Sequence, residues 1–99
     1  MNKELQDKEF KEILSYYRTI QIKLQNRANR GQKVMVRKAF NLALNAHKTM
    51  RRRSGEPYII HPLEVAIIVL EQMNLGATSV VCSLLHDTVE DTDYTLRDI

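Results

Sequence analysis

Four side chains that can do chemistry lie close together near the end of the sequence: His86, Asp87, Glu90 and Asp91. Apolar residues recur at helical spacing around them, which predicts a helix over residues 78–91, and at roughly 100° per residue the four fall within one arc of about 140°. Three neighbouring acids repel one another unless a cation lies among them, and no Lys or Arg occurs between Ser83 and Asp93. A divalent metal, a water molecule and a phosphate would explain the cluster. The alternative is an ordinary solvated acidic helix end, which is the more common case for such a cluster taken alone.

The composition predicts that a small all-α domain, or part of a larger one, carries this cluster. The 99 residues are 43% hydrophobic and 27% charged and include only three Gly and two Pro, which leaves few turns and is ordinary for a globular protein. No apolar run approaches the length of a membrane span, and the first residues do not open a signal peptide. The single Cys82, expected on the apolar side of its helix, excludes a disulfide framework, so we expect a cytoplasmic protein. The net charge of +3 is too small to indicate nucleic acid binding.

Hydrophobic periodicity and turn-forming residues divide the chain into a series of helices. The expected helices cover residues 3–28, 32–50, 62–73 and 78–91, with Thr95 as the cap of a fifth. Asn29-Arg30-Gly31 breaks the pattern between the first two, and Gly76 is suited to end the third. The apolar faces of the first and third helices include Phe10, Leu14 and Val65. Because the sequence stops within the fifth helix, we expect it to be the N-terminal part of a longer domain.

One histidine is expected to face the interior. His47 lies on the inward stripe of the second helix, together with Val36, Phe40, Ala43 and Met50. A histidine on an apolar face is either a hydrogen-bonded core residue or a metal ligand. We favour the core interpretation.

A basic loop connects the second and third helices. Ser-Gly and Glu-Pro within residues 51–62 form turns, and Pro62 can open the third helix, which leaves His61 at the cap position. The arginines at 51–53 are a nucleic-acid patch, a solvated corner or a contact for a phosphorylated small molecule. We favour the small molecule because an acidic cluster is expected opposite them, and because Arg offers bidentate donors to phosphate and a flat face for a base.

Four motifs occur in order and at sensible spacing: Ala46-His47-Lys48, Arg52-Arg53-Ser54-Gly55-Glu56-Pro57-Tyr58, His61-Pro62 and Leu85-His86-Asp87-Thr88-Val89-Glu90-Asp91-Thr92. Together they resemble the N-terminal HD hydrolase domain of the RelA/SpoT family, whose members make and destroy guanosine tetra- and pentaphosphate. The resemblance covers roughly residues 36–99. It implies an all-α HD-domain fold, truncated here after about four to five helices, and Mn²⁺-dependent removal of the 3′-pyrophosphate from these nucleotides.

The resemblance also implies which residues would hold the metal and activate the water. The metal ligands fall on His61, His86 and Asp87, and a fourth ligand, an Asp, lies beyond the end of this sequence. The catalytic pair tied to water activation falls on Glu90 and Asp91. Two imidazoles and carboxylates make a mixed site suited to Mn²⁺, Fe²⁺ or Zn²⁺.

Further positions of the family pattern concern the nucleotide. Arg52 matches the residue that packs against guanine, and Arg53 and Ser54 would help to shape the nucleotide pocket. His47 matches a position that is not a metal ligand. Thr49-Met50 departs from the Gly-Gln of many members.

The resulting hypothesis is a hydrolase domain from a longer, bifunctional synthetase and hydrolase of the stringent response. Residues 1–30 would form a leading helix and residues 36–99 the HD-motif core. Without the fourth ligand, the fragment itself is expected to be inactive. The alternatives are an HD-fold phosphohydrolase of another nucleotide and a non-catalytic nucleotide-binding module. The expected partner is guanosine tetra- or pentaphosphate rather than nucleic acid or membrane, and self-association through an exposed apolar face stays open.

Overall fold

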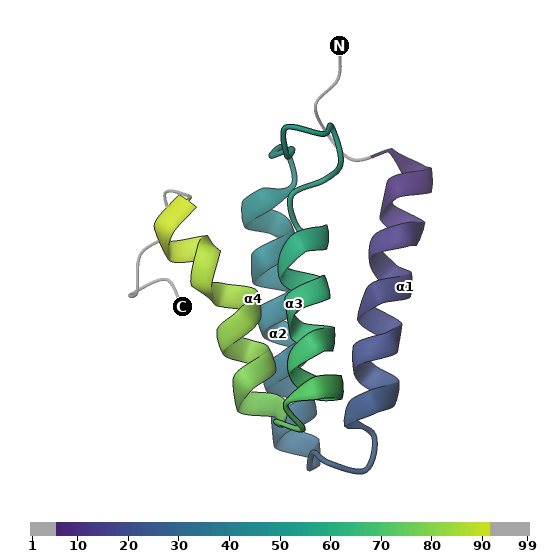
Figure 1. Cartoon of the computed structure of the whole chain (residues 1–99), viewed down its shortest axis with the longest axis vertical. Coiled ribbons are helices and arrows are strands. Elements are labelled where there is room, and N and C mark those ends of the chain that lie inside the picture. Colours follow the sequence, from purple (N-terminus) through teal and green to yellow (C-terminus); the bar gives the residue numbers. More distant parts are fainter. Residues whose placement is uncertain (1–5, 92–99) are drawn as a thin grey trace.

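Four helices account for most of residues 6–91. The computed structural model describes residues 6–91, with side chains for residues 6–86. The helices are α1 (Asp7–Leu24), α2 (Arg30–His47), α3 (Ile60–Gln72) and α4 (Ala77–Asp91). They run side by side, and α3 lies between α1 and α4 with α2 behind it (Figure 1). Within residues 6–91 the only β-type pairing is the isolated bridge between Arg51 and Pro57, which confirms the predicted all-α class.

The core is an aliphatic layer where α3 meets its neighbours. α3 contributes Leu63, Ala66 and Leu70, and α4 contributes Val80 and Leu84, each with no exposed surface. Fully burying one such large aliphatic side chain stabilises the fold by roughly 1.5–3 kcal/mol. Together with the buried side chains of α2, this layer holds α4 against both α2 and α3, and these contacts position the predicted site.

The starts of the first two helices differ from the sequence prediction. The Gln32 N–H donates to Asn29 Oδ1 at 2.8 Å, and Gln32 Oε1 accepts from the Asn29 N–H at 2.9 Å. This reciprocal cap begins α2 at Arg30 and leaves Gly31 inside its first turn. The predicted break between the two helices is confirmed, but it covers residues 25–29 rather than 29–31. α1 begins in the same way, because Glu9 Oε1 accepts from the Gln6 N–H at 3.1 Å.

The predicted ends of α1 and α2 were too late by about one turn. α1 stops at Leu24 instead of residue 28, because the Arg27 N–H turns back to the Leu24 carbonyl at 3.0 Å. α2 stops at His47 instead of residue 50, and the Met50 N–H donates to the His47 carbonyl at 2.9 Å. Each closing turn satisfies a carbonyl that has no partner within the helix.

The start of α3 also differs from the prediction. The helix begins at Ile60, so His61 lies in its first turn rather than at the cap position. The Ile60 N–H donates to the Pro57 carbonyl at 3.3 Å and the His61 N–H to the Tyr58 carbonyl at 3.1 Å, which starts the turn before the proline. Pro62 is tolerated there because the first turn of a helix does not need its N–H.

The left-handed residue in the connection from α3 to α4 is Asn74 rather than the predicted Gly76. Asn74, with φ 52°, adopts the left-handed conformation expected of Gly76; asparagine tolerates this region better than most residues. The Gly76 carbonyl instead accepts from the Val80 N–H at 3.2 Å at the start of α4. α4 begins at Ala77, one residue before the predicted start, and ends at Asp91 as predicted, so the helix predicted over residues 78–91 is confirmed.

Several predicted inward residues lie closer to the surface. Phe10 and Leu14 are each 41% exposed, because α1 packs mainly on α3 through Ile13 and Ile20. Val65 is half-buried. Cys82 is exposed rather than on the apolar side of α4. The predicted fifth helix at Thr95 lies outside the described residues.

The helices of residues 6–91 differ from membrane spans, because none of them combines the length and hydrophobicity that a membrane crossing requires.

Candidate functional site

His61 and His86 line the same hollow between α3 and α4. Its volume is about 360 Å³, and its lining residues are His61, Pro62, Val65, Cys82, Ser83 and His86. His61 and Val65 are one turn apart on α3, and Cys82 and His86 are one turn apart on α4, so each helix presents one face to the hollow. The structure therefore brings together the two predicted histidine ligands, which come from separate segments of the chain.

Packing on the opposite face of α4 directs His86 outward. Val80 and Leu84 are fully buried against the core, whereas His86, two residues after Leu84, is exposed. On α3, Pro62 and Leu63 are buried while His61 is only half-buried. Each histidine thus stands at the edge of the core, on a rigid helix and in contact with open space.

His47 at the end of α2 stacks on Tyr58, which lies two residues before the start of α3. His47 has no exposed surface, and its ring lies 5.0 Å from the Tyr58 ring with an interplanar angle of 5°. The burial of His47 agrees with the core interpretation made from the sequence.

The described part of the hollow offers imidazole nitrogens, a thiol and a hydroxyl. The Ser83 hydroxyl donates to the Ser79 carbonyl at 2.9 Å, so it is engaged within α4. The side chains of residues 6–86 form no group of three or more His, Cys, Asp or Glu that could hold a metal. The side chains of the predicted site residues Asp87, Glu90 and Asp91 lie outside the described residues, although their backbones belong to α4.

The predicted nucleotide-binding residues lie on a separate loop at the entrance to α3. Arg52, Arg53 and Ser54 are exposed, and none of them lines the hollow. Arg52 Nη1 lies 3.4 Å from Glu56 Oε1, with both side chains 42% exposed. The structure therefore does not bring these three residues into contact with the two histidines, and their role stays a prediction.

Sequence reasoning missed an ion pair that joins this loop to α1. Arg51 Nη1 and Nη2 donate to Glu9 Oε2 and Oε1, both at 2.7 Å. The hydrogen bond from Arg51, followed by that from the Gln6 N–H, lowers the pKa of Glu9 to about 2. The same hydrogen bond raises the pKa of Arg51. No signal in the sequence pairs the two residues, which are far apart in the chain.

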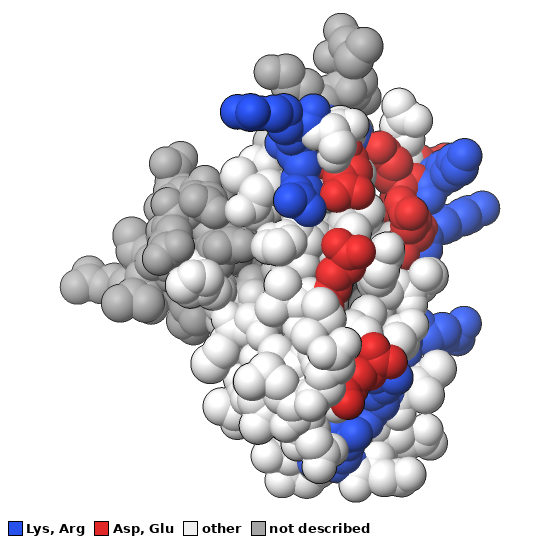
Figure 2. All heavy atoms as spheres, viewed as in Figure 1, with Lys and Arg blue, Asp and Glu red and all other residues white. Residues whose placement is uncertain are grey.

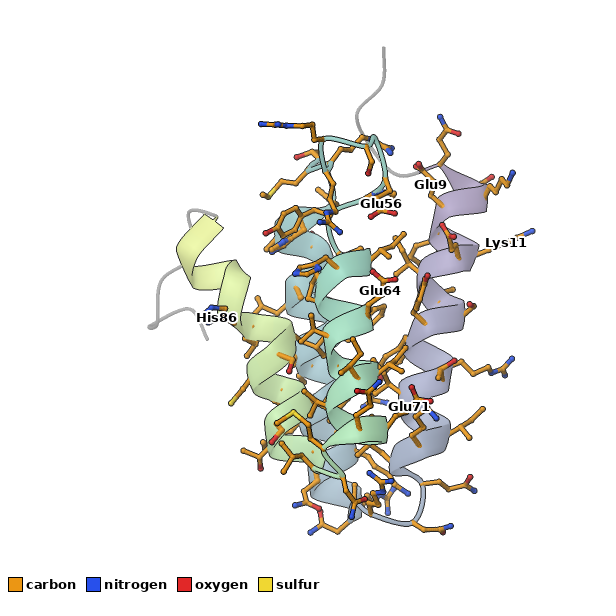
Figure 3. The ribbon with its side chains drawn as sticks, viewed as in Figure 1. Glu9, Lys11, Glu56, Glu64, Glu71 and His86 are labelled. Carbon is orange, nitrogen blue, oxygen red and sulfur yellow. The ribbon has the colours of Figure 1, made fainter. Side chains whose placement is uncertain are left out.

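Acidic side chains line the seam between α1 and α3, on the other side of α3 from His86. Figure 3 shows Glu9, Glu56, Glu64 and Glu71 along this seam. Burial, and then the negative charges of Glu64, Glu12 and Glu56, raise the pKa of Tyr16 there. In Figure 2 acidic side chains run along this side of the molecule, and basic side chains lie at its upper end, along its right edge and near its lower end. Three of these carboxylates are paired with basic side chains: Glu9 with Arg51, Glu56 with Arg52 and Glu71 with Lys23.

Comparison with known proteins adds information on the segment that carries the two histidines. The family model described as an HD domain matches residues 39–99. A protein of Mycobacterium leprae (strain TN) named "Probable GTP pyrophosphokinase" is 53% identical over 63 residues, which are 64% of this chain and 8% of the relative. A "Guanosine-3′,5′-bis(diphosphate) 3′-pyrophosphohydrolase" of Aquifex aeolicus (strain VF5) is 42% identical over 64 residues, 65% of this chain and 9% of the relative.

A third relative is also named as a pyrophosphokinase. The "GTP pyrophosphokinase" of Streptomyces coelicolor is 42% identical over 64 residues, 65% of this chain and 7% of the relative. The chain thus spans less than a tenth of the length of these three relatives. Two of the three are named as pyrophosphokinases and one as a pyrophosphohydrolase.

Proposed function

The chain belongs to the HD domain family, in its RelA/SpoT branch, and we propose that the protein removes the 3′-pyrophosphate from guanosine tetra- and pentaphosphate. The observation that supports this proposal most directly is the shared hollow of His61 and His86. The name of the Aquifex aeolicus relative describes the same hydrolysis.

The residues of the hollow fit a divalent metal in their chemistry. His61 and His86 come from two helices fixed by one core, and neither ring is enclosed by apolar side chains. Imidazole is a suitable ligand for Mn²⁺, Fe²⁺ and Zn²⁺, and Asp87 would add a carboxylate. When bound, Mn²⁺ would lower the pKa of a water molecule and neutralise charge that develops on phosphate.

The remaining steps are proposed for side chains of this chain. Glu90 would accept a proton from the attacking water, with Asp91 helping to orient it, because a general base must lie within hydrogen-bond reach of the proton that it takes. Arg52 would stack on guanine, and Arg53 and Ser54 would contact phosphate or ribose. Residues 36–99 would form the hydrolase core, preceded by α1 (Asp7–Leu24) as the leading helix, in a cytoplasmic protein.

The test uses the full-length protein and separates metal binding from turnover. Wild type, His86→Ala and Glu90→Gln are compared in bound Mn²⁺ and in steady-state release of pyrophosphate from guanosine tetraphosphate. His86→Ala should lose both. Glu90→Gln should keep the metal but lose turnover by about 10²–10⁴-fold, the usual contribution of a general base. Glu64→Gln, a similar charge change on the acidic seam, is the matched control and should change neither.

The outcomes also distinguish the alternatives. Tight binding of guanosine tetraphosphate without turnover by the wild type would favour a non-catalytic nucleotide-binding module. Turnover of another nucleotide alone would favour a different HD-type hydrolase. Release of metal by Glu90→Gln would make Glu90 a ligand, and unchanged turnover would move the base elsewhere, with Asp91 next.

A further inference from the structure

The ion pair between Arg51 and Glu9 uses both terminal nitrogens of the Arg51 guanidinium. Besides the two bonds to Glu9, Arg51 Nη1 donates to the Gly55 carbonyl at 2.8 Å. The two charged side chains are only 24% and 23% exposed. One guanidinium therefore joins the first turn of α1 to the tip of the loop over residues 51–57. A planar guanidinium can do this because its donors are held in a fixed fork.

The loop is closed by its own backbone in the same region. The Arg52 N–H donates to the Glu56 carbonyl at 2.9 Å, and the Gly55 N–H donates to the Arg52 carbonyl at 2.8 Å. Gly55 has φ 97°, a conformation that glycine adopts without strain. The turn that carries Arg53 and Ser54 is thus held at its base by backbone bonds and at its tip by Arg51.

We propose that Glu9 and Arg51 form a clamp that holds this loop in the conformation in which Arg52, Arg53 and Ser54 meet a phosphorylated ligand. The identity of the ligand in this inference rests on the proposed function. Both residues act as positioning residues, because Arg51 is occupied by Glu9 and by Gly55 and is therefore not available to phosphate. Glu9 belongs to α1, which lies outside the matched HD segment of residues 39–99.

The clamp is expected to affect ligand affinity through the population of the competent loop. Glu9 is ionised at neutral pH because its pKa is about 2, so the pair is fully charged under ordinary conditions. If the loop opens, the apparent dissociation constant rises, because it equals the intrinsic constant divided by the fraction of molecules whose loop stays competent. Side chains on a loop can bind a ligand in a defined geometry only when further contacts hold those side chains and the loop in place.

The test compares two substitutions that remove the same charge from α1. Glu9→Gln keeps an oxygen for the Gln6 N–H, so the helix cap is preserved, but it removes the ionic acceptor of Arg51. Glu12→Gln removes an exposed carboxylate about one turn further along and is the matched control. Arg51→Lys keeps the positive charge but lacks the fork that reaches Glu9 and Gly55 together.

The first measurement is hydrogen exchange, comparing loop peptides with core peptides of α2 and α3. In Glu9→Gln, protection over residues 51–58 should fall by about two- to fivefold, the range set by partly exposed ion pairs. Core peptides should stay unchanged, because loops open locally without unfolding the core. Glu12→Gln should match the wild type, and adding Glu9→Gln to Arg51→Lys should cause little further loss. Unchanged loop protection, or an equal fall in loop and core, would overturn the clamp.

The second measurement is the dissociation constant for guanosine tetraphosphate. In Glu9→Gln it should rise by the ratio of the competent fractions of wild type and variant, which the exchange data give, and it should stay unchanged in Glu12→Gln. A competent fraction that falls while the affinity stays unchanged would overturn the positioning role. If the wild type itself does not bind this nucleotide, the proposed function fails, and hydrogen exchange alone decides whether the clamp holds the loop.

Discussion

Leu84→Ala should loosen the attachment of α4 and thereby weaken the site that α4 carries. Leu84 has no exposed surface and lies two residues before His86. Deleting a fully buried leucine side chain costs about 2–5 kcal/mol, since both the transfer of apolar atoms and the cavity left behind contribute. A domain of this size is stable by only about 5–15 kcal/mol. The midpoint of thermal unfolding should therefore fall by at least about 8 °C.

The measurement is urea unfolding followed by circular dichroism, which gives the free energy of unfolding and the denaturant slope. Ile68→Ala is the matched control, because it removes a similar side chain from α3 at a position that is 47% exposed. The control should change the free energy by no more than about 0.5 kcal/mol. A loss below about 1 kcal/mol for Leu84→Ala, or equal losses for both variants, would refute the placement of α4 against the core.

Two further predictions concern the loop. The folded-state pKa of Glu9 is depressed to about 2 from an ordinary 4.5, so the contribution of the clamp to stability should be complete above pH ~4.5 and disappear as the pH falls toward ~2. In an acid titration, the difference in stability between wild type and Glu9→Gln should therefore close within that window. A difference that persists below it would contradict the assigned pair. Arg52→Ala should raise the Michaelis constant for guanosine tetraphosphate by up to about thirtyfold while leaving bound Mn²⁺ unchanged, as expected for the loss of a desolvated stacking contact. Arg52→Lys should rescue poorly, and full rescue would indicate a simple charge role instead.

Much of the fold could be predicted because its signals are local. The apolar spacing around Leu84 predicted α4 to within one residue at its start, and the stripe through His47 predicted its burial. The errors came from contacts between elements. Phe10 fits an inward face by spacing, but α1 meets α3 along Ile13 and Ile20, which rotates Phe10 toward solvent.

The candidate site could be predicted only in part. The meeting of His61 and His86 depends on the packing of α3 against α4, which spacing alone does not determine; the family resemblance supplied that expectation, and the shared hollow agrees with it. The pairing of Arg51 with Glu9 could not be predicted, because α1 lies outside the recognised motifs and one arginine among three carries no distinguishing mark. The roles of Arg52, Arg53 and Ser54 stay predictions.

The central claim is that His61 and His86 bind one metal ion together. Titration with Mn²⁺ while the imidazole proton signals are observed by nuclear magnetic resonance tests it most directly, because the paramagnetic ion broadens nearby signals even when it binds weakly. Both histidine signals should broaden together along one saturation curve, and in His61→Ala the broadening of His86 should require a much higher Mn²⁺ concentration. Separate saturation curves, or a His86 response that is unaffected by His61→Ala, would contradict a shared site.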